Sequence, residues 1–143
     1  MSRVLGRRGA AVGAGVAALL SLSLAGCSAG TYDAYSGTVS NGDVVGDWTS
    51  DCAASLVMTA GGKVTATAFP TAWDDSGNAT KTFSGAGDWW LSNAPGGDQG
   101  LSVSLNNLIN ILPYASVHGK LGFAYDIMYD DAAGEEFCIF SKA

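Results

Sequence analysis

The feature that most limits the fold is a series of short segments of strand character, separated by turn signals, that runs from Val44 to the end of the chain. Gly61-Gly62 and "DDSGN" at 74–78 are typical of turns, and no long helical pattern lies between the segments. About seven or eight strands at hairpin spacing predict an all-β fold, either a small antiparallel meander closed into a barrel or a tight sandwich.

Alternation along two segments indicates which residues share a face. Leu101, Val103 and Leu105 alternate with serines, and "LGFAYDIMYD" places Phe123, Tyr125, Ile127 and Tyr129 on one side. These residues are predicted to face a common core.

The segment "LNNLINILP" supports two readings. Leu105, Leu108, Ile109 and Leu112 have helical spacing, but part of the same segment also fits alternation, and Pro113 ends either element. We expect one short helix near 106–112, covering an end of the barrel.

The first 26 residues have the pattern of an export signal. Arg3, Arg7 and Arg8 precede an uncharged stretch of Ala, Gly, Val and Leu that ends in small residues. A retained membrane helix is the alternative, but only about 18 residues separate Arg8 from Cys27, which is marginal for crossing a bilayer. We therefore expect residues 1–26 to be removed as a signal peptide.

Leu24-Ala25-Gly26-Cys27 resembles the lipobox of bacterial lipoproteins. The resemblance implies that Cys27 becomes the mature N-terminus and carries fatty acyl chains such as palmitate. It also implies a lipid anchor at the extracytoplasmic face of the cell membrane, because two acyl chains hold a protein there firmly.

The mature chain is acidic. Beyond Cys27 it has four lysines and thirteen acidic residues, hence a net charge of −9. Such a surface repels phosphate, which excludes electrostatic binding of nucleic acid and leaves attachment to the membrane to the lipid on Cys27. Residues 27–43, rich in Ser, Gly, Thr and Asp, are predicted to be a flexible tether, and residues 44–143 a single β-barrel domain.

Cys52 and Cys138 are the two cysteines left after lipidation. They lie near the end of the first predicted strand and within the last one, and these two strands are neighbours in a closed meander. In an exported protein they are predicted to form a disulfide, with two free buried thiols as the alternative.

Gly46-Asp47-Trp48 resembles the Gly-x-Trp opening of lipocalin-like barrels, in which the Trp closes one end. The order "VVGDWTSD", "SLVMTAGGKVTATAFP", "SGAGDWWL" and "FCIF" is similar to that of small lipoproteins of high-GC Gram-positive bacteria. Lipocalins also place an Arg near the last strand against this Trp, whereas this chain offers only Lys142. Trp48 as an ordinary core aromatic is the alternative.

No residue pattern indicates an enzyme, a metal site or a cofactor. His118 is the single histidine and lies in a predicted turn, no Gly-x-Ser-x-Gly motif occurs, and the acidic turns at 74–78 and 129–136 lack the spacing of an EF-hand. The sequence therefore predicts a protein that acts by binding rather than by catalysis.

The aromatic residues are the remaining indication of function. Trp89 and Trp90 are adjacent in one strand, so one of them has to face outward. Trp48, Trp89, Phe123 and Tyr125 are candidate ligand-binding residues for a small apolar molecule inside the barrel, and an outward indole would suit an envelope component. The alternative is a packed interaction module without a cavity, such as an inhibitor or an envelope assembly factor.

Overall fold

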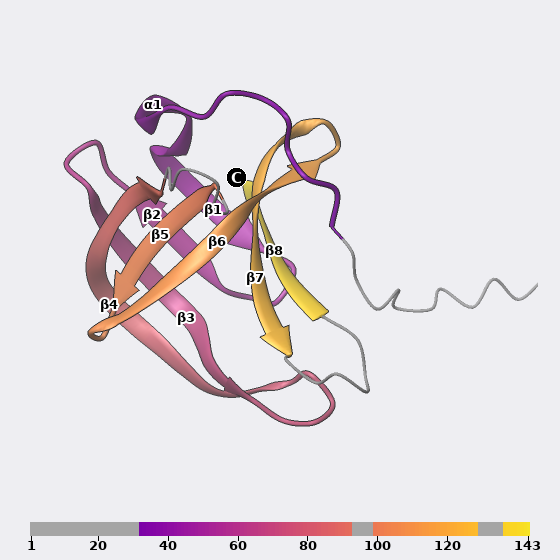
Figure 1. The fold of residues 1–143 in the computed structure, drawn as a ribbon. Coiled ribbons are helices and arrows are strands. Elements are labelled where there is room, and N and C mark those ends of the chain that lie inside the picture. The colour runs from indigo at the N-terminus through magenta and orange to yellow at the C-terminus, as the bar shows by residue number, and fades with distance from the viewer. Residues whose placement is uncertain (1–31, 93–98, 129–135) are drawn as a thin grey trace, which may run out of the picture.

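The computed structural model describes residues 32–92, 99–128 and 136–143. Within them, one short helix precedes eight strands (Figure 1). The elements are α1 (Asn41–Val44), β1 (Gly46–Ser50), β2 (Ser55–Met58), β3 (Lys63–Trp73), β4 (Ala79–Ser92), β5 (Gly100–Leu105), β6 (Leu108–Val117), β7 (Lys120–Met128) and β8 (Glu136–Lys142).

The strands form a closed antiparallel barrel in sequence order, in which β1 also pairs with β8. This confirms the prediction of a small all-β meander and decides for the barrel over the sandwich. The predicted turns at Gly61-Gly62 and 74–78 connect β2 to β3 and β3 to β4. Closure pairs the first strand with the last, while β3 and β4 extend past their other neighbours as a hairpin from Phe69↔Phe83 to Trp73↔Ala79.

The core follows the alternation of the strands. The largest fully buried side chains come from almost every strand and include Trp48, Phe69, Phe123 and Phe140. The rings of Trp48 and Phe123 have centroids 4.5 Å apart, and those of Phe69 and Tyr125 4.7 Å apart. The second pair joins β3 to β7, which lie on opposite sides of the eight-stranded barrel, so these two rings meet across its interior.

The prediction of a short helix near 106–112 is wrong. Leu108 to Leu112 belong to β6, which pairs with β5 from Leu105↔Leu108 onward across a two-residue turn. Both turn residues, Asn106 and Asn107, have positive φ, at 48° and 63°. This is the conformation that a tight hairpin turn requires and that asparagine tolerates. The turn therefore makes the following segment a strand with alternating faces and not a helix.

The segment Tyr32–Ser40, here called the strap, lies against the barrel. The backbone N–H of Tyr35 donates to the carbonyl of Tyr114 at 3.2 Å, and that of Ser116 donates to the carbonyl of Asp33 at 2.7 Å. These bonds use the part of β6 that extends beyond its pairing with β5. The tether expected over 27–43 is thus attached to the barrel from Asp33 onward, and Figure 1 shows the strap passing from α1 over the β6–β7 end.

Cys52 and Cys138 form the predicted disulfide, with Cα atoms 5.6 Å apart. Cys52 follows β1 and Cys138 lies in β8, so the bond joins the two strands that close the barrel. Next to it, the backbone N–H of Ile139 donates to the Asp51 carboxylate at 2.8 Å. The seam between the first and last strands is therefore held by backbone pairing and by a covalent bond.

The predicted signal peptide at 1–26 and the lipidation site Cys27 lie outside the described residues. Within the described part of the chain, none of the helices has the length and apolar character needed to cross a membrane.

Candidate functional site

Three of the four predicted ligand-binding residues, Trp48, Trp89 and Phe123, are buried in the core. Trp48 and Phe123 pack against each other, and the Trp48 indole N–H donates to the carbonyl of Val44 at 2.7 Å. Tyr125 is half-buried, and its hydroxyl donates to the carbonyl of Pro70 at 3.2 Å. The polar groups of these aromatics are thus engaged with the backbone of the barrel itself.

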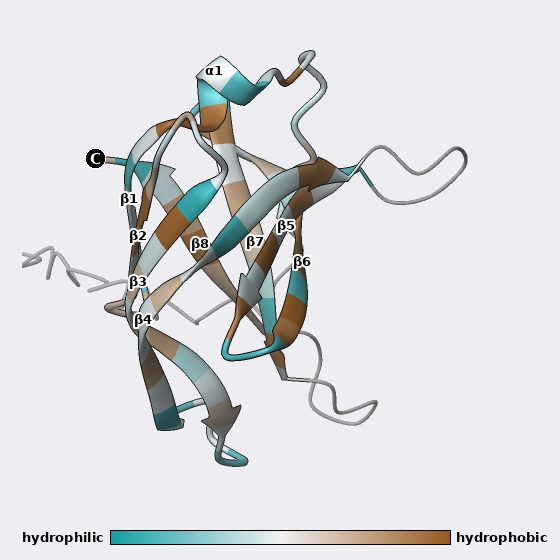
Figure 2. Cartoon of the chain, turned by 90° about the vertical axis from the view of Figure 1, so that its left-hand side faces the viewer, coloured by the Kyte–Doolittle hydropathy of each residue, from teal (hydrophilic) through white to brown (hydrophobic). Residues whose placement is uncertain are grey.

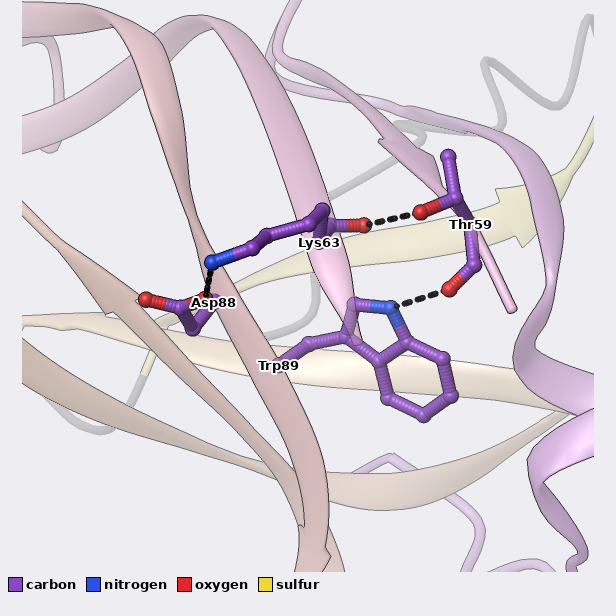
Figure 3. A network of polar contacts seen from close by, with 4 residues as sticks. All are labelled: Thr59, Lys63, Asp88 and Trp89. Carbon is purple, nitrogen blue, oxygen red and sulfur yellow. Dashed lines mark hydrogen bonds and ion pairs between the residues drawn. The ribbon is translucent and has the colours of Figure 1, made fainter. Parts of the chain in front are cut away.

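Trp89, the fourth of these residues, takes part in a network that holds the β2–β3 turn (Figure 3). Its indole N–H donates to the carbonyl of Thr59 at 3.0 Å, while the Thr59 hydroxyl donates to the carbonyl of Lys63 at 3.3 Å. Lys63 in turn forms an ion pair with Asp88, the residue before Trp89. Trp89 therefore fixes a turn against β4.

Tyr114 adds a buried hydroxyl to the interior. Among the described side chains its hydroxyl has no hydrogen-bond partner, and burial raises the pKa of Tyr114. The phenol stays protonated at neutral pH, so it contributes no charge to the core.

Trp90 is the outward-facing member of the Trp89-Trp90 pair, as adjacent positions in a strand require. It is 41% exposed, and Ile109 and Ile111 of β6 are 63% and 55% exposed. The register places Ser102 between Trp90 and Ile111, and Ser104 next to Ile109. We call these five residues of β4, β5 and β6 the outer apolar face.

The outer apolar face has no charged member. Ser102 is 1% exposed although it lies on the outside of β5, and its hydroxyl is hydrogen-bonded to that of Ser92. Leu108 at the β5–β6 turn is 61% exposed as well, but it faces the other side of the sheet, because its register partner is the buried Leu105. In Figure 2 the lower part of β6 is hydrophobic, next to the hydrophilic turn.

A second surface feature lies at the barrel end that Trp48 closes, and we call it the end cleft. It has a volume of about 250 Å³ and opens to solvent. Its walls come from the strap, α1, the start of β7 and the end of β8. The lining residues are Tyr35, Thr38, Gly42, Asp43, Trp48, Lys120, Leu121 and Lys142.

Lys142 lies over Trp48 at this end of the barrel. It is the register partner of Trp48, its Nζ lies 5.5 Å from the Trp48 ring centroid, and it donates to the carbonyl of Asp43 at 3.0 Å. A cation therefore covers the indole at this end of the barrel, and it also holds α1 in place.

The remaining polar features are His118 and the group formed by Asp51, Cys52 and Cys138. His118 lies exposed in the β6–β7 turn, as predicted. Asp51 lies close to Cys52 and Cys138, but the disulfide removes both thiolates as ligands. Residues 129–135, most of the second acidic turn, lie outside the described part.

Comparison of the chain with protein-family models, curated proteins and solved structures gives no match.

Sequence reasoning missed the end cleft entirely and the outer apolar face in part. The sequence predicts that either Trp89 or Trp90 faces outward, but Ile109 and Ile111 lie in a segment that fits both a helical and an alternating pattern, and a short helix is expected there. The asparagine pair at 106–107 was the signal that could have indicated a hairpin turn. A turn there makes 108–112 a strand and puts Ile109 and Ile111 on its outer side.

Proposed function

We propose that this protein is a lipid-anchored interaction module of the cell envelope, attached to the membrane through Cys27, that binds a partner protein with its outer apolar face. The exposure of Trp90, Ile109 and Ile111 on one surface of the barrel carries the proposal. Large exposed apolar side chains that gather on one face are typical of interaction sites, whereas isolated ones are ordinary.

The composition of the face favours an interface over a ligand site. Trp is enriched among residues that dominate binding energy, and here it lies two strands away from Ile111 with a small serine between them. The described interior is filled by large side chains such as Trp48, Phe69 and Phe123. Binding on the outside of the barrel therefore has more support than a ligand cup.

Charge determines the kind of partner. A mature chain with a net charge of −9 repels a second copy of itself and an anionic lipid surface. Asp88, which borders the outer apolar face on β4, is paired with Lys63. We therefore expect a protein partner whose contact surface is apolar at its centre and neutral or basic at its edge.

The test is a photo-activated cross-linking residue at position 111 of the full-length chain, in intact cells of its own host. We expect one discrete adduct with a protein, and we expect Trp90→Ser to reduce it at least tenfold, because central aromatic residues of an interface typically contribute about 2 kcal/mol or more. The matched control carries the cross-linker in place of Val57, which is 43% exposed on the outside of β2, and should give no such adduct.

Two outcomes would contradict partner binding by this face. One is an adduct of the same yield from positions 57 and 111, and the other is an adduct at position 111 that Trp90→Ser leaves unchanged. An adduct of twice the mass of the chain would instead assign the face to self-association.

The anchor is tested separately. Cys27→Ala in the full-length chain should abolish labelling with radioactive palmitate and release the protein from washed cells. Cys52→Ala leaves Cys27 in place and serves as the control for labelling. Unchanged retention of Cys27→Ala would refute the proposed anchor without bearing on the outer apolar face.

A further inference from the structure

We infer that the end cleft is a binding site for a small free molecule that carries a carboxylate or phosphate group on a compact apolar body. This site is distinct from the outer apolar face. The cleft is formed at the Trp48 end by the strap, α1, β7 and β8, whereas the face lies on the outside of β4, β5 and β6.

Positive charge is concentrated at the end cleft. After residue 31 the chain has four lysines and no arginine, and two of the four, Lys120 and Lys142, line the cleft. Of the other two, Lys63 is neutralised by Asp88. The chain has thirteen acidic residues, so the two lysines make the cleft a region of positive potential that attracts anions.

Asp43 has the one carboxylate among the lining residues, and this carboxylate is hydrogen-bonded to Ser40 within the chain. Its Oδ2 accepts hydrogen bonds from the backbone N–H and the hydroxyl of Ser40, at 2.8 and 2.6 Å. These bonds lower the pKa of Asp43, so it remains ionised and bound to Ser40. The two lysines therefore leave the lining with a net positive charge.

The Lys142 ammonium is held ready for a ligand. One of its three N–H groups donates to the carbonyl of Asp43, which leaves two for an anion. Its stem passes over Gly46, where a Cβ would lie 3.1 Å from Lys142 Cε, so a glycine at this position makes room for it. Lys120 has no ion pair with any residue that the structure describes.

The apolar part of the lining and the size of the cleft limit the ligand. Trp48, Leu121 and Tyr35 offer ring and aliphatic surface next to the two ammonium groups. The volume of about 250 Å³ is below the roughly 300–1,000 Å³ of sites for drug-sized ligands. A single small ring with one anionic group fits these limits.

The experiment is a titration of the ¹⁵N-labelled full-length chain in detergent with phenyl phosphate, followed through the Trp48 indole N–H signal. We expect saturable shifts with a Kd near or below about 1 mM, weakened by added NaCl. Benzoate should bind in the same place. Inorganic phosphate, which lacks the ring, and benzyl alcohol, which lacks the charge, should each bind at least fivefold more weakly.

Two lysine variants locate the site. Lys120→Met should raise the Kd for phenyl phosphate about fivefold or more, because it removes one charge and keeps the stem. Lys81→Met, on β4 and outside the cleft lining, is the control and should leave the Kd unchanged.

The inference is overturned by any of three results. These are no shift at Trp48 with phenyl phosphate, equal affinity for phenyl phosphate and benzyl alcohol, or equal Kd values for the unmodified chain and Lys120→Met. None of them depends on whether the outer apolar face binds a protein.

Discussion

Removing the disulfide should weaken the closure of the barrel more than the loss of any single hydrogen bond would. Cys52 and Cys138 are 86 residues apart in the sequence, so the bond constrains nearly the whole folded chain. Loop-closure entropy gives an upper value of about 4.5 kcal/mol for a loop of this length, and measured losses are typically about 2–5 kcal/mol. The seam has few non-covalent links, namely three register pairs from Trp48↔Lys142 to Ser50↔Phe140 and one backbone hydrogen bond beyond each end, from Ala143 N–H to Asp47 and from Asp51 N–H to Ile139.

The variant to measure is Cys52→Ala combined with Cys138→Ala in the full-length chain, by thermal unfolding followed with far-UV circular dichroism. A loss of 2–4.5 kcal/mol in a domain of this size corresponds to a decrease in Tm of roughly 10–30 °C. Reduction of the unmodified protein should lower its Tm by a similar amount and leave the double variant unaffected. A decrease of less than about 3 °C in both experiments would refute the conclusion that the disulfide secures the seam.

Three further predictions concern single positions. Gly87→Ala should destabilise the fold by about 1–3 kcal/mol in urea unfolding, because a Cβ at position 87 would lie 2.1 Å from the carbonyl oxygen of Ser104. Gly61→Ala is the control and should not destabilise the fold, because a Cβ at position 61 would have nothing within 4 Å. Asn107→Gly should raise the Tm by a few degrees, since φ at Asn107 is 63°, and an unchanged or lower Tm would contradict the strain argument. Hydrogen bonds from Asn78 and Ser76 lower the pKa of Asp74, so its stabilising effect is complete above about pH 4 and is lost as the pH falls through the folded-state pKa. The Tm difference between the unmodified chain and Asp74→Ala should therefore shrink as the pH is lowered below about 4, and a difference that stays constant would contradict this assignment.

The barrel could be predicted because its strands and turns have strong local signals. Alternation along "LSVSL" and "LGFAYDIMYD" placed Leu101, Val103 and Phe123 in the core, where the structure has them. The segment near 106–112, expected to be a helix, could not be assigned from hydrophobic spacing alone. Apolar spacing over eight residues fits both periods, and the deciding information lay in the backbone preference of two asparagines.

The strap was not predictable from side chains. Residues 32–40 have no apolar period, and the backbone hydrogen bonds that hold them to β6 are ones that any sequence can form. Tyr35 and Val39 also pack against the core, and the centroid of the Tyr32 ring lies 4.9 Å from that of Phe137, but isolated contacts of this kind give no periodic signal in the sequence. The strap can pair with β6 because β6 is longer than its partner β5. This difference in length is a property of the strand register and not of the composition. The end cleft depends on the same placement, because Tyr35 and Thr38 of the strap form one of its walls.

The apolar residues on the outside of β4 and β6 are not explained by the needs of strand formation. On β1 and β3 the outward positions are polar, and Thr49, Thr65 and Thr67 supply β-branched side chains there without apolar exposure. The chain could use threonine in the same way at 109 and 111 but has isoleucine at both. Over the paired part of β4, β5 and β6 the backbone offers no free edge to another chain, so association there uses side chains on the outer face. The choice of isoleucine over threonine at these two positions, two strands away from the exposed Trp90, is therefore the residue pattern expected of an interface.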